Sequence, residues 1–225
     1  MTTQAEHDGD DESGADDHFF AASLREFPWP WAASAAVATF VVEYLLVAAL
    51  FVLGPSSVDR SVPIINSTIA VLVQYAHILF NAHFVWIVQA ATVPNVQIPE
   101  PFSNDLWLAL LSGGAATHPL VYFLLPVVSL VIAGAVFERN RDSPATGRFT
   151  EAGLVGAGFT VGYLAVGILG SVTLVQRVPI NGSDGFLTQQ PDLYFTAIMF
   201  LVFPMLFATL GAALAYDRDQ ASSSH

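Results

Sequence analysis

The sequence has no cysteine and no lysine, and only 12% of its 225 residues are charged. The lack of cysteine excludes disulfides, zinc–thiolate sites, iron–sulfur clusters and thiol nucleophiles. An ordinary soluble domain has roughly 25% charged residues, so a soluble enzyme is disfavoured. The motifs of serine hydrolases, zinc proteases and nucleotide-binding enzymes are also missing from the sequence. We therefore expect no enzyme, no cofactor and no metal site.

The charge that is present is mostly negative. Nineteen acidic residues stand against seven basic residues, all of them arginine, which gives a formal net charge of −12. An acidic surface keeps a protein soluble in concentrated salt, where charges are screened over about 3 Å at 1 M ionic strength. The composition favours a halophilic archaeal protein, and the alternative is a chance excess of acid in one tail. No basic stripe is available to meet phosphates, which argues against nucleic acid as a partner.

Long apolar blocks dominate the rest of the chain and predict an all-α fold, a polytopic bundle of transmembrane helices. A helix needs about 20 apolar residues to cross the hydrocarbon core. Residues 1–27 are expected to form a disordered acidic tail, 28–217 a transmembrane domain and 218–225 a C-terminal tail. Five blocks, separated by glycine- and proline-containing connections, are long enough to span: 31–53, 67–91, 118–137, 153–175 and 193–216.

A shorter apolar stretch over residues 104–116 precedes the third block and predicts a short helix. Glycines and a His-Pro pair interrupt it, so it is either an interfacial helix or a re-entrant half-helix. The positive-inside rule places the loop 138–152 and the C-terminus in the cytoplasm under both alternatives. The side of the N-terminus differs between the alternatives and stays open. The expected location is the cell membrane, crossed several times.

Polar residues inside the predicted spans are the candidate functional residues. Glu43 lies in the middle of the first block. Inserting an unpaired carboxylate at that depth of the membrane costs roughly several kcal/mol of free energy. Helical spacing of 100° per residue puts Gln74, His77 and Asn81 on one face of the second block, and His83 on nearly the opposite face. We predict a polar centre formed by Glu43 with His77 and Asn81, with His83 as the other candidate partner.

This polar centre has three possible roles at the level of sequence. The carboxylate and a histidine can simply hold two helices together, or they can carry a proton or bind a cation. A metal site is the weakest alternative, because His77 and His83 cannot share one helical face. In the fourth block, Gly158 and Gly162 form a G-x-x-x-G pair that allows close helix packing, within the chain or between two copies.

The segment Asn81-Ala82-His83-Phe84-Val85 resembles a signature of a group of uncharacterised haloarchaeal multi-pass membrane proteins. The stretches Phe27-Pro28-Trp29 and Pro191-Asp192-Leu193 are similar to that group too. Some of its members are labelled transporters, but the resemblance implies no established activity. It does imply that Asn81 and His83 are candidate functional residues.

Two functions follow as expectations. The first is a small transporter or channel-like component with the polar centre of Glu43, Gln74, His77, Asn81 and His83. The second is a non-catalytic structural or accessory membrane subunit, whose polar residues only fix helix packing. In both cases the lipid bilayer is a partner, and a protein partner or a second copy of the chain is possible.

Overall fold

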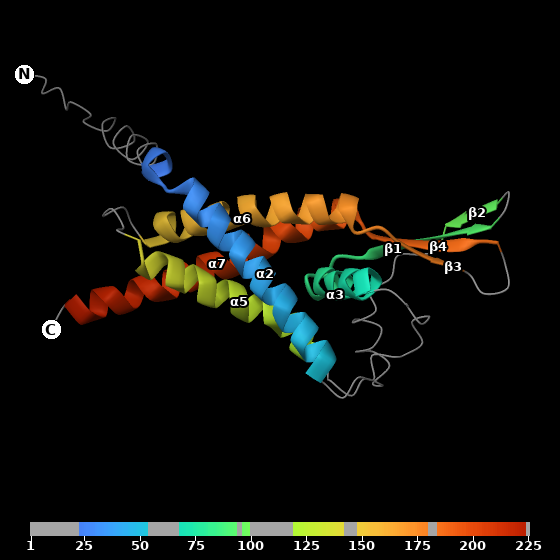
Figure 1. The fold of residues 1–225 in the computed structure, drawn as a ribbon. Coiled ribbons are helices and arrows are strands. Elements are labelled where there is room, and N and C mark those ends of the chain that lie inside the picture. The colour runs from blue at the N-terminus through green and yellow to red at the C-terminus, as the bar shows by residue number, and fades with distance from the viewer. Residues whose placement is uncertain are drawn as a thin grey trace, which may run out of the picture.

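The computed structural model describes residues 23–53, 68–93, 96–99, 119–141, 148–179 and 184–223. Its core is a bundle of four long helices: α2 (Trp29–Leu53), α5 (Leu120–Arg139), α6 (Arg148–Thr173) and α7 (Leu193–Ser223). A shorter helix, α3 (Thr68–Ala82), lies at one end of the bundle, beside a small sheet (Figure 1). The predicted short helix over 104–116 and most of the predicted N-terminal tail lie outside the described residues.

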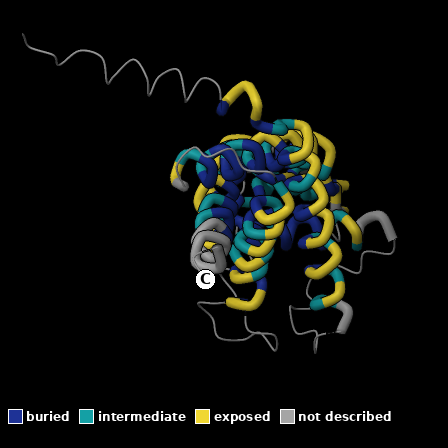
Figure 2. The backbone as a smooth tube through the Cα atoms, turned by 90° about the vertical axis from the view of Figure 1, so that its left-hand side faces the viewer, coloured by how far each residue is buried: buried dark blue, intermediate teal, exposed yellow. Residues whose placement is uncertain are grey.

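Four of the five predicted spans lie on helices of sufficient length and hydropathy to cross a membrane. The apolar stretches are Trp29–Phe51, Leu120–Arg139, Phe149–Thr173 and Leu193–Ala215. Residues that face the bundle axis are buried and those on the outside are exposed (Figure 2). Many of the exposed side chains are aliphatic, including Val41, Leu45 and Leu124. Exposed aliphatic side chains on long apolar helices fit an integral membrane protein, because lipid tails can cover them.

Close contacts through glycine hold the helices together. A Cβ atom on Gly134 or Gly211 would run into the backbone of the facing helix, at Ala208 and Val131 respectively. Gly158 and Gly162 of α6 lie against α2 in the same way, and a Cβ on Gly158 would come within 2.5 Å of the Ala32 Cβ. The G-x-x-x-G pair therefore packs within the chain, where the absence of side chains lets two backbones approach.

A four-stranded antiparallel sheet projects beyond the helices, at the end opposite the start of α2 and the end of α7 (Figure 1). Its strands are β1 (Ile87–Val93), β2 (Val96–Pro99), β3 (Gln176–Pro179) and β4 (Phe186–Pro191), in the order β2-β1-β4-β3. The central pairing joins two distant parts of the chain, with Ile87 opposite Pro191 and Gln89 opposite Gln189. The backbone N–H of Asp192 donates to the Trp86 carbonyl at 2.9 Å and ties the start of α7 to the segment before β1.

Two of the predictions from sequence are wrong. The block 67–91 is not one spanning helix, because α3 ends at Ala82 and β1 follows. The fold is also mostly helical and not all-α, because it contains strands. The helix ends in a Schellman motif, in which Val85 N–H donates to the Phe80 carbonyl and Phe84 N–H donates to Asn81. Phe84 takes the left-handed position, with φ of 61°. Average hydropathy contains no signal for such a turn.

The start of α2, the end of α7, the end of α5 and the start of α6 lie at the end of the bundle opposite the sheet (Figure 1). Phe27, just before α2, packs against Phe137 near the end of α5 with ring centroids 6.3 Å apart. The Arg141 guanidinium lies 5.1 Å from the Phe27 ring centroid.

Candidate functional site: a buried Glu43–His83–Tyr163 centre

Glu43, His83 and Tyr163 meet in the interior of the bundle, one each from α2, the end of α3 and α6. Glu43 and His83 are both 0% exposed. The Tyr163 hydroxyl donates a hydrogen bond to Glu43 Oε1 at 2.8 Å, and Glu43 Oε2 lies 3.4 Å from His83 Nε2. Among the described residues, neither Oε2 nor Nε2 has a hydrogen-bond partner, and the two atoms lie within ion-pair distance of each other. The two atoms therefore depend on each other.

His83 also closes the end of α3. Its Nδ1 lies 2.9 Å from the Leu79 carbonyl oxygen, and its backbone N–H points to the same carbonyl and to that of Phe80. A carbonyl oxygen only accepts hydrogen bonds, so Nδ1 carries a hydrogen and donates it. The remaining ring nitrogen, Nε2, is left to face the Glu43 carboxyl group. A histidine at a helix C-terminus also interacts favourably with the negative end of the helix dipole.

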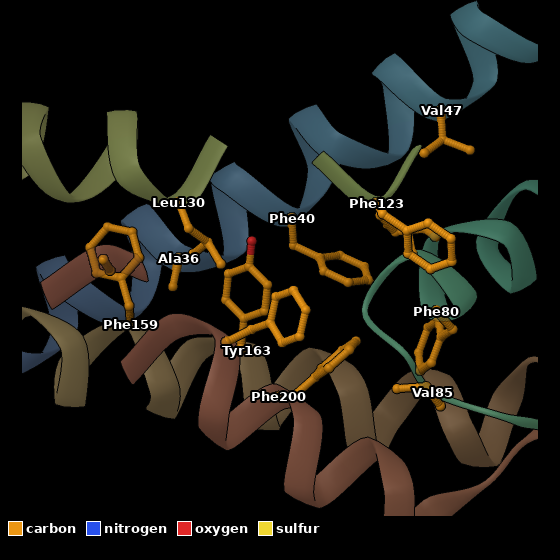
Figure 3. Close-up of a cluster of buried hydrophobic side chains, with 14 of the residues drawn as sticks. Ala36, Phe40, Val47, Phe80, Val85, Phe123, Leu130, Phe159, Tyr163 and Phe200 are labelled. Atoms are coloured by element: carbon orange, nitrogen blue, oxygen red, sulfur yellow. The ribbon is translucent and has the colours of Figure 1, made fainter. Parts of the chain in front are cut away.

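Aromatic rings enclose the pair and separate it from lipid and water. Ring centroids of Phe200, Phe203 and Tyr163 lie 4.9, 5.3 and 5.8 Å from that of His83. Phe40, one turn before Glu43 on α2, lies 6.2 Å away. Figure 3 shows the rings of Phe40, Tyr163 and Phe200 grouped between the helices, with the Tyr163 hydroxyl pointing towards α2. The centre is closed by packed side chains.

The other predicted site residues lie elsewhere on α3. His77 Nε2 is 2.9 Å from the carbonyl oxygen of Leu174, just beyond α6, and the Asn81 amide donates to the His77 carbonyl at 3.0 Å. Gln74 is half buried. The structure thus brings Glu43 together with His83, the residue placed on the far face by helical spacing. That spacing holds only inside a helix, and His83 lies just past the end of α3.

Sequence reasoning missed two sets of residues. The first is Tyr163, which directly follows Gly162. A buried tyrosine hydroxyl needs a hydrogen-bond partner, so a tyrosine within an apolar block was the available signal. The second set is an ion-pair network at the opposite end of the bundle, where the Arg141 guanidinium donates to Glu138 at 3.0 Å and to Glu151 at 2.6 Å. It joins the end of α5 to the start of α6.

The profile of a family of unknown function, DUF7978, matches residues 31–219. The chain belongs to this family. No curated protein and no solved structure matches the chain. The family match covers all the residues of the buried centre, from Glu43 on α2 to Phe203 on α7.

The arrangement limits what the centre can do chemically. Within the described part of the chain, no group of three or more histidine and carboxylate side chains is placed to hold a metal ion. One carboxyl group, one imidazole and one phenol can accept, donate and exchange protons. The residues are therefore suited to linking three helices through hydrogen bonds and to holding a proton.

Proposed function

We propose that this DUF7978 chain is a structural or accessory membrane subunit without catalytic activity, whose polar centre locks the helices in place. The observation that carries the proposal is the complete burial of Glu43 and His83, which face each other at 3.4 Å. A conduction site needs contact with water at some stage, whereas a packing lock needs none. The Tyr163 hydrogen bond adds a third helix to the lock.

A small transporter or channel-like component is the second candidate, and one observation favours it. Helix α3 lies at the sheet end of the bundle and ends at Ala82 (Figure 1). His83 follows, with its ring centroid 5.8 Å from that of Tyr163 on α6, and the chain then continues into β1. Tyr163 lies about 15 Å along α6 from Thr173, at 1.5 Å per residue. Broken helices that end near the membrane midplane form the ion sites of many transporters.

Access of water to the centre separates the two candidates, and the cysteine-free chain makes it measurable. Single cysteines at Phe40 and Phe200, which line the pair, are expected to stay unreactive towards a charged thiol reagent at neutral pH. A cysteine at the exposed Asp184 is the positive control and reacts fully. The total thiol content is counted after unfolding in detergent. Reaction at Phe200→Cys in the folded protein would favour the transporter.

We also propose an orientation, with the sheet outside the cell and both ends of the described chain in the cytoplasm of a halophilic archaeon. Arginine counting supports it. Five arginines lie on or next to the helix ends opposite the sheet: Arg25, Arg139, Arg141, Arg148 and Arg218. Of the other two arginines, Arg177 lies on β3 in the sheet, and Arg60 follows α2 in the sequence. A protein partner or a second copy would then be met in the membrane or at the sheet.

The orientation predicts opposite labelling of two exposed positions. A membrane-impermeant thiol reagent added to intact cells is expected to label Asp184→Cys, beside β4, and to leave Asn140→Cys, after α5, unlabelled. Asn140→Cys becomes reactive once the membrane is permeabilised. Both residues are exposed in the structure, so accessibility does not differ for reasons of burial. Labelling of Asn140→Cys in intact cells would reverse the orientation.

A further inference from the structure

The contacts of the Glu43–His83 pair determine how many protons it holds. His83 Nδ1–H is committed to the Leu79 carbonyl, and the Tyr163 hydroxyl hydrogen is committed to Glu43 Oε1. What remains is the 3.4 Å gap between Oε2 and Nε2, which is within ion-pair distance, and neither atom has a hydrogen-bond partner among the described residues. The number of protons in this gap sets the charge and the sign of the interaction.

Only one of the three proton counts is attractive and neutral overall. With no proton, a carboxylate oxygen faces the lone pair of Nε2, and a net negative charge is buried. With two protons, both groups present a donor, and a net positive charge is buried. With one proton, an N–H or O–H group points at an acceptor and the pair has no net charge. Burying an uncompensated charge is costly, so the docked pair holds one proton.

We propose that Glu43 and His83 form a proton-binding clamp: they share one proton between Oε2 and Nε2, and this proton keeps the end of α3 docked in the bundle. The proposal rests on the proposed function, because it states that the lock holds α3 in place only when the pair carries this proton. Release of α3 would free the segment that leads directly into β1, and the clamp would thereby connect pH to the attachment of the sheet.

In the described part of the chain, the titratable side chain that bonds the pair is Tyr163, and its hydroxyl hydrogen is directed to Glu43 Oε1. The side chains that contact the pair are Phe40 of α2 and Tyr163 of α6. Helix α7 contributes the rings of Phe200 and Phe203. The other histidine of α3, His77, is directed to the Leu174 carbonyl near the sheet. The proton count of the gap therefore belongs to Glu43 and His83 together.

The sign of the pH dependence follows from counting protons on both states. In a released, hydrated α3, glutamate and histidine titrate near their ordinary values of about 4.3 and 6.5. Above about pH 7 the released pair holds no proton, while the docked pair holds one. Docking then takes up one proton, and the equilibrium constant for release rises by up to about tenfold per pH unit. Between about pH 5 and pH 6 both states hold one proton, and the dependence vanishes.

Glu43→Gln provides a matched variant that imitates the one-proton state permanently. Its amide oxygen accepts from the Tyr163 hydroxyl, and its NH₂ group donates to His83 Nε2, which is an acceptor when Nδ1 carries the hydrogen. This glutamine does not titrate. In the variant, the docked and released states hold the same number of protons above about pH 7, because both contain a neutral histidine.

The test uses a single cysteine at Ala82, which is 0% exposed in the last turn of α3. The rate of thiol labelling of Ala82→Cys is measured in the full-length protein from about pH 6 to pH 9, with and without the Glu43→Gln substitution. When release and redocking are fast, this rate follows the population of the released state. The ratio of the two rates removes the common pH dependence of thiol chemistry, and Asp184→Cys verifies that chemistry independently.

We divide the labelling rate of the protein with Glu43 by that of the Glu43→Gln variant. This ratio is expected to be flat near pH 6 and to rise by up to about a hundredfold between pH 7 and pH 9. A flat ratio over the whole range would overturn the clamp. Failure of the Glu43→Gln variant to fold would overturn it too, because the amide supplies both hydrogen bonds of the one-proton state. The lock itself is judged separately, by labelling of Phe40→Cys and Phe200→Cys at neutral pH.

Discussion

Replacing His83 with alanine is expected to destabilise the helical bundle by roughly 3–5 kcal/mol, the usual cost of removing one partner from a buried pair. The Glu43 Oε2 atom has no hydrogen-bond partner among the described residues, so the substitution leaves it stranded in the interior. The end of α3 also loses the side-chain bond to the Leu79 carbonyl. The free energy of unfolding can be measured by denaturation in detergent micelles.

The same helix supplies a control for this experiment. His77 is also buried, and its ring bonds the Leu174 carbonyl, a neutral acceptor. His77→Ala should cost less, on the order of 1–2 kcal/mol, because it removes a hydrogen bond to a neutral carbonyl group. Combining His83→Ala with Glu43→Leu should recover part of the loss, since the second change removes the stranded carboxyl group. Equal losses for the two histidines would contradict the assignment of His83 as the partner of Glu43.

Replacing Gly211 with alanine is expected to cost about 1–3 kcal/mol through overpacking between α5 and α7. The new Cβ atom would run into the Val131 carbonyl group, and it would also lie 3.0 Å from the backbone nitrogen of Ala135. Backbone atoms cannot rotate away as the end of a flexible side chain can, so the two helices must move apart. Denaturation in micelles measures the loss.

Gly153→Ala is the matched control, because nothing lies within 4 Å of the Cβ position on this glycine of α6. Alanine favours a helix more than glycine does, by about 0.8–1.0 kcal/mol in water. The Gly153→Ala protein should therefore be as stable as the parent or slightly more so. If Gly211→Ala were equally harmless, the close approach of α5 and α7 would be wrong.

The four long apolar helices were predictable because their signal is local. Lipid-exposed segments must satisfy every backbone hydrogen bond internally, and long apolar runs between glycines and prolines reveal where this happens. The sheet was not predictable in this way. Its central strands, β1 and β4, are far apart in the sequence, and β4 contains Gln189 and Gln190 in a stretch that was interpreted as a connection. This stretch forms a strand only because it pairs with β1 and β3.

The candidate site was half predictable. A carboxylate in the middle of an apolar helix needs a partner, and this identified Glu43 and a small group of candidates. The correct histidine could not be chosen, because the position of His83 depends on the turn at Phe84 and not on helical spacing. Tyr163 was missed because the arrangement of α2 beside α6 is a property of the packed bundle.

The distance along the chain between Glu43 and Tyr163, 120 residues, has a consequence for biosynthesis. At translation rates of about 5–20 residues per second, the ribosome reaches Tyr163 roughly 6–24 s after Glu43 has been made. During that interval α2 contains an acidic group without its phenol partner. The carboxyl group can meet His83 earlier, but the complete centre of three residues can form only after the second half of the chain has been made.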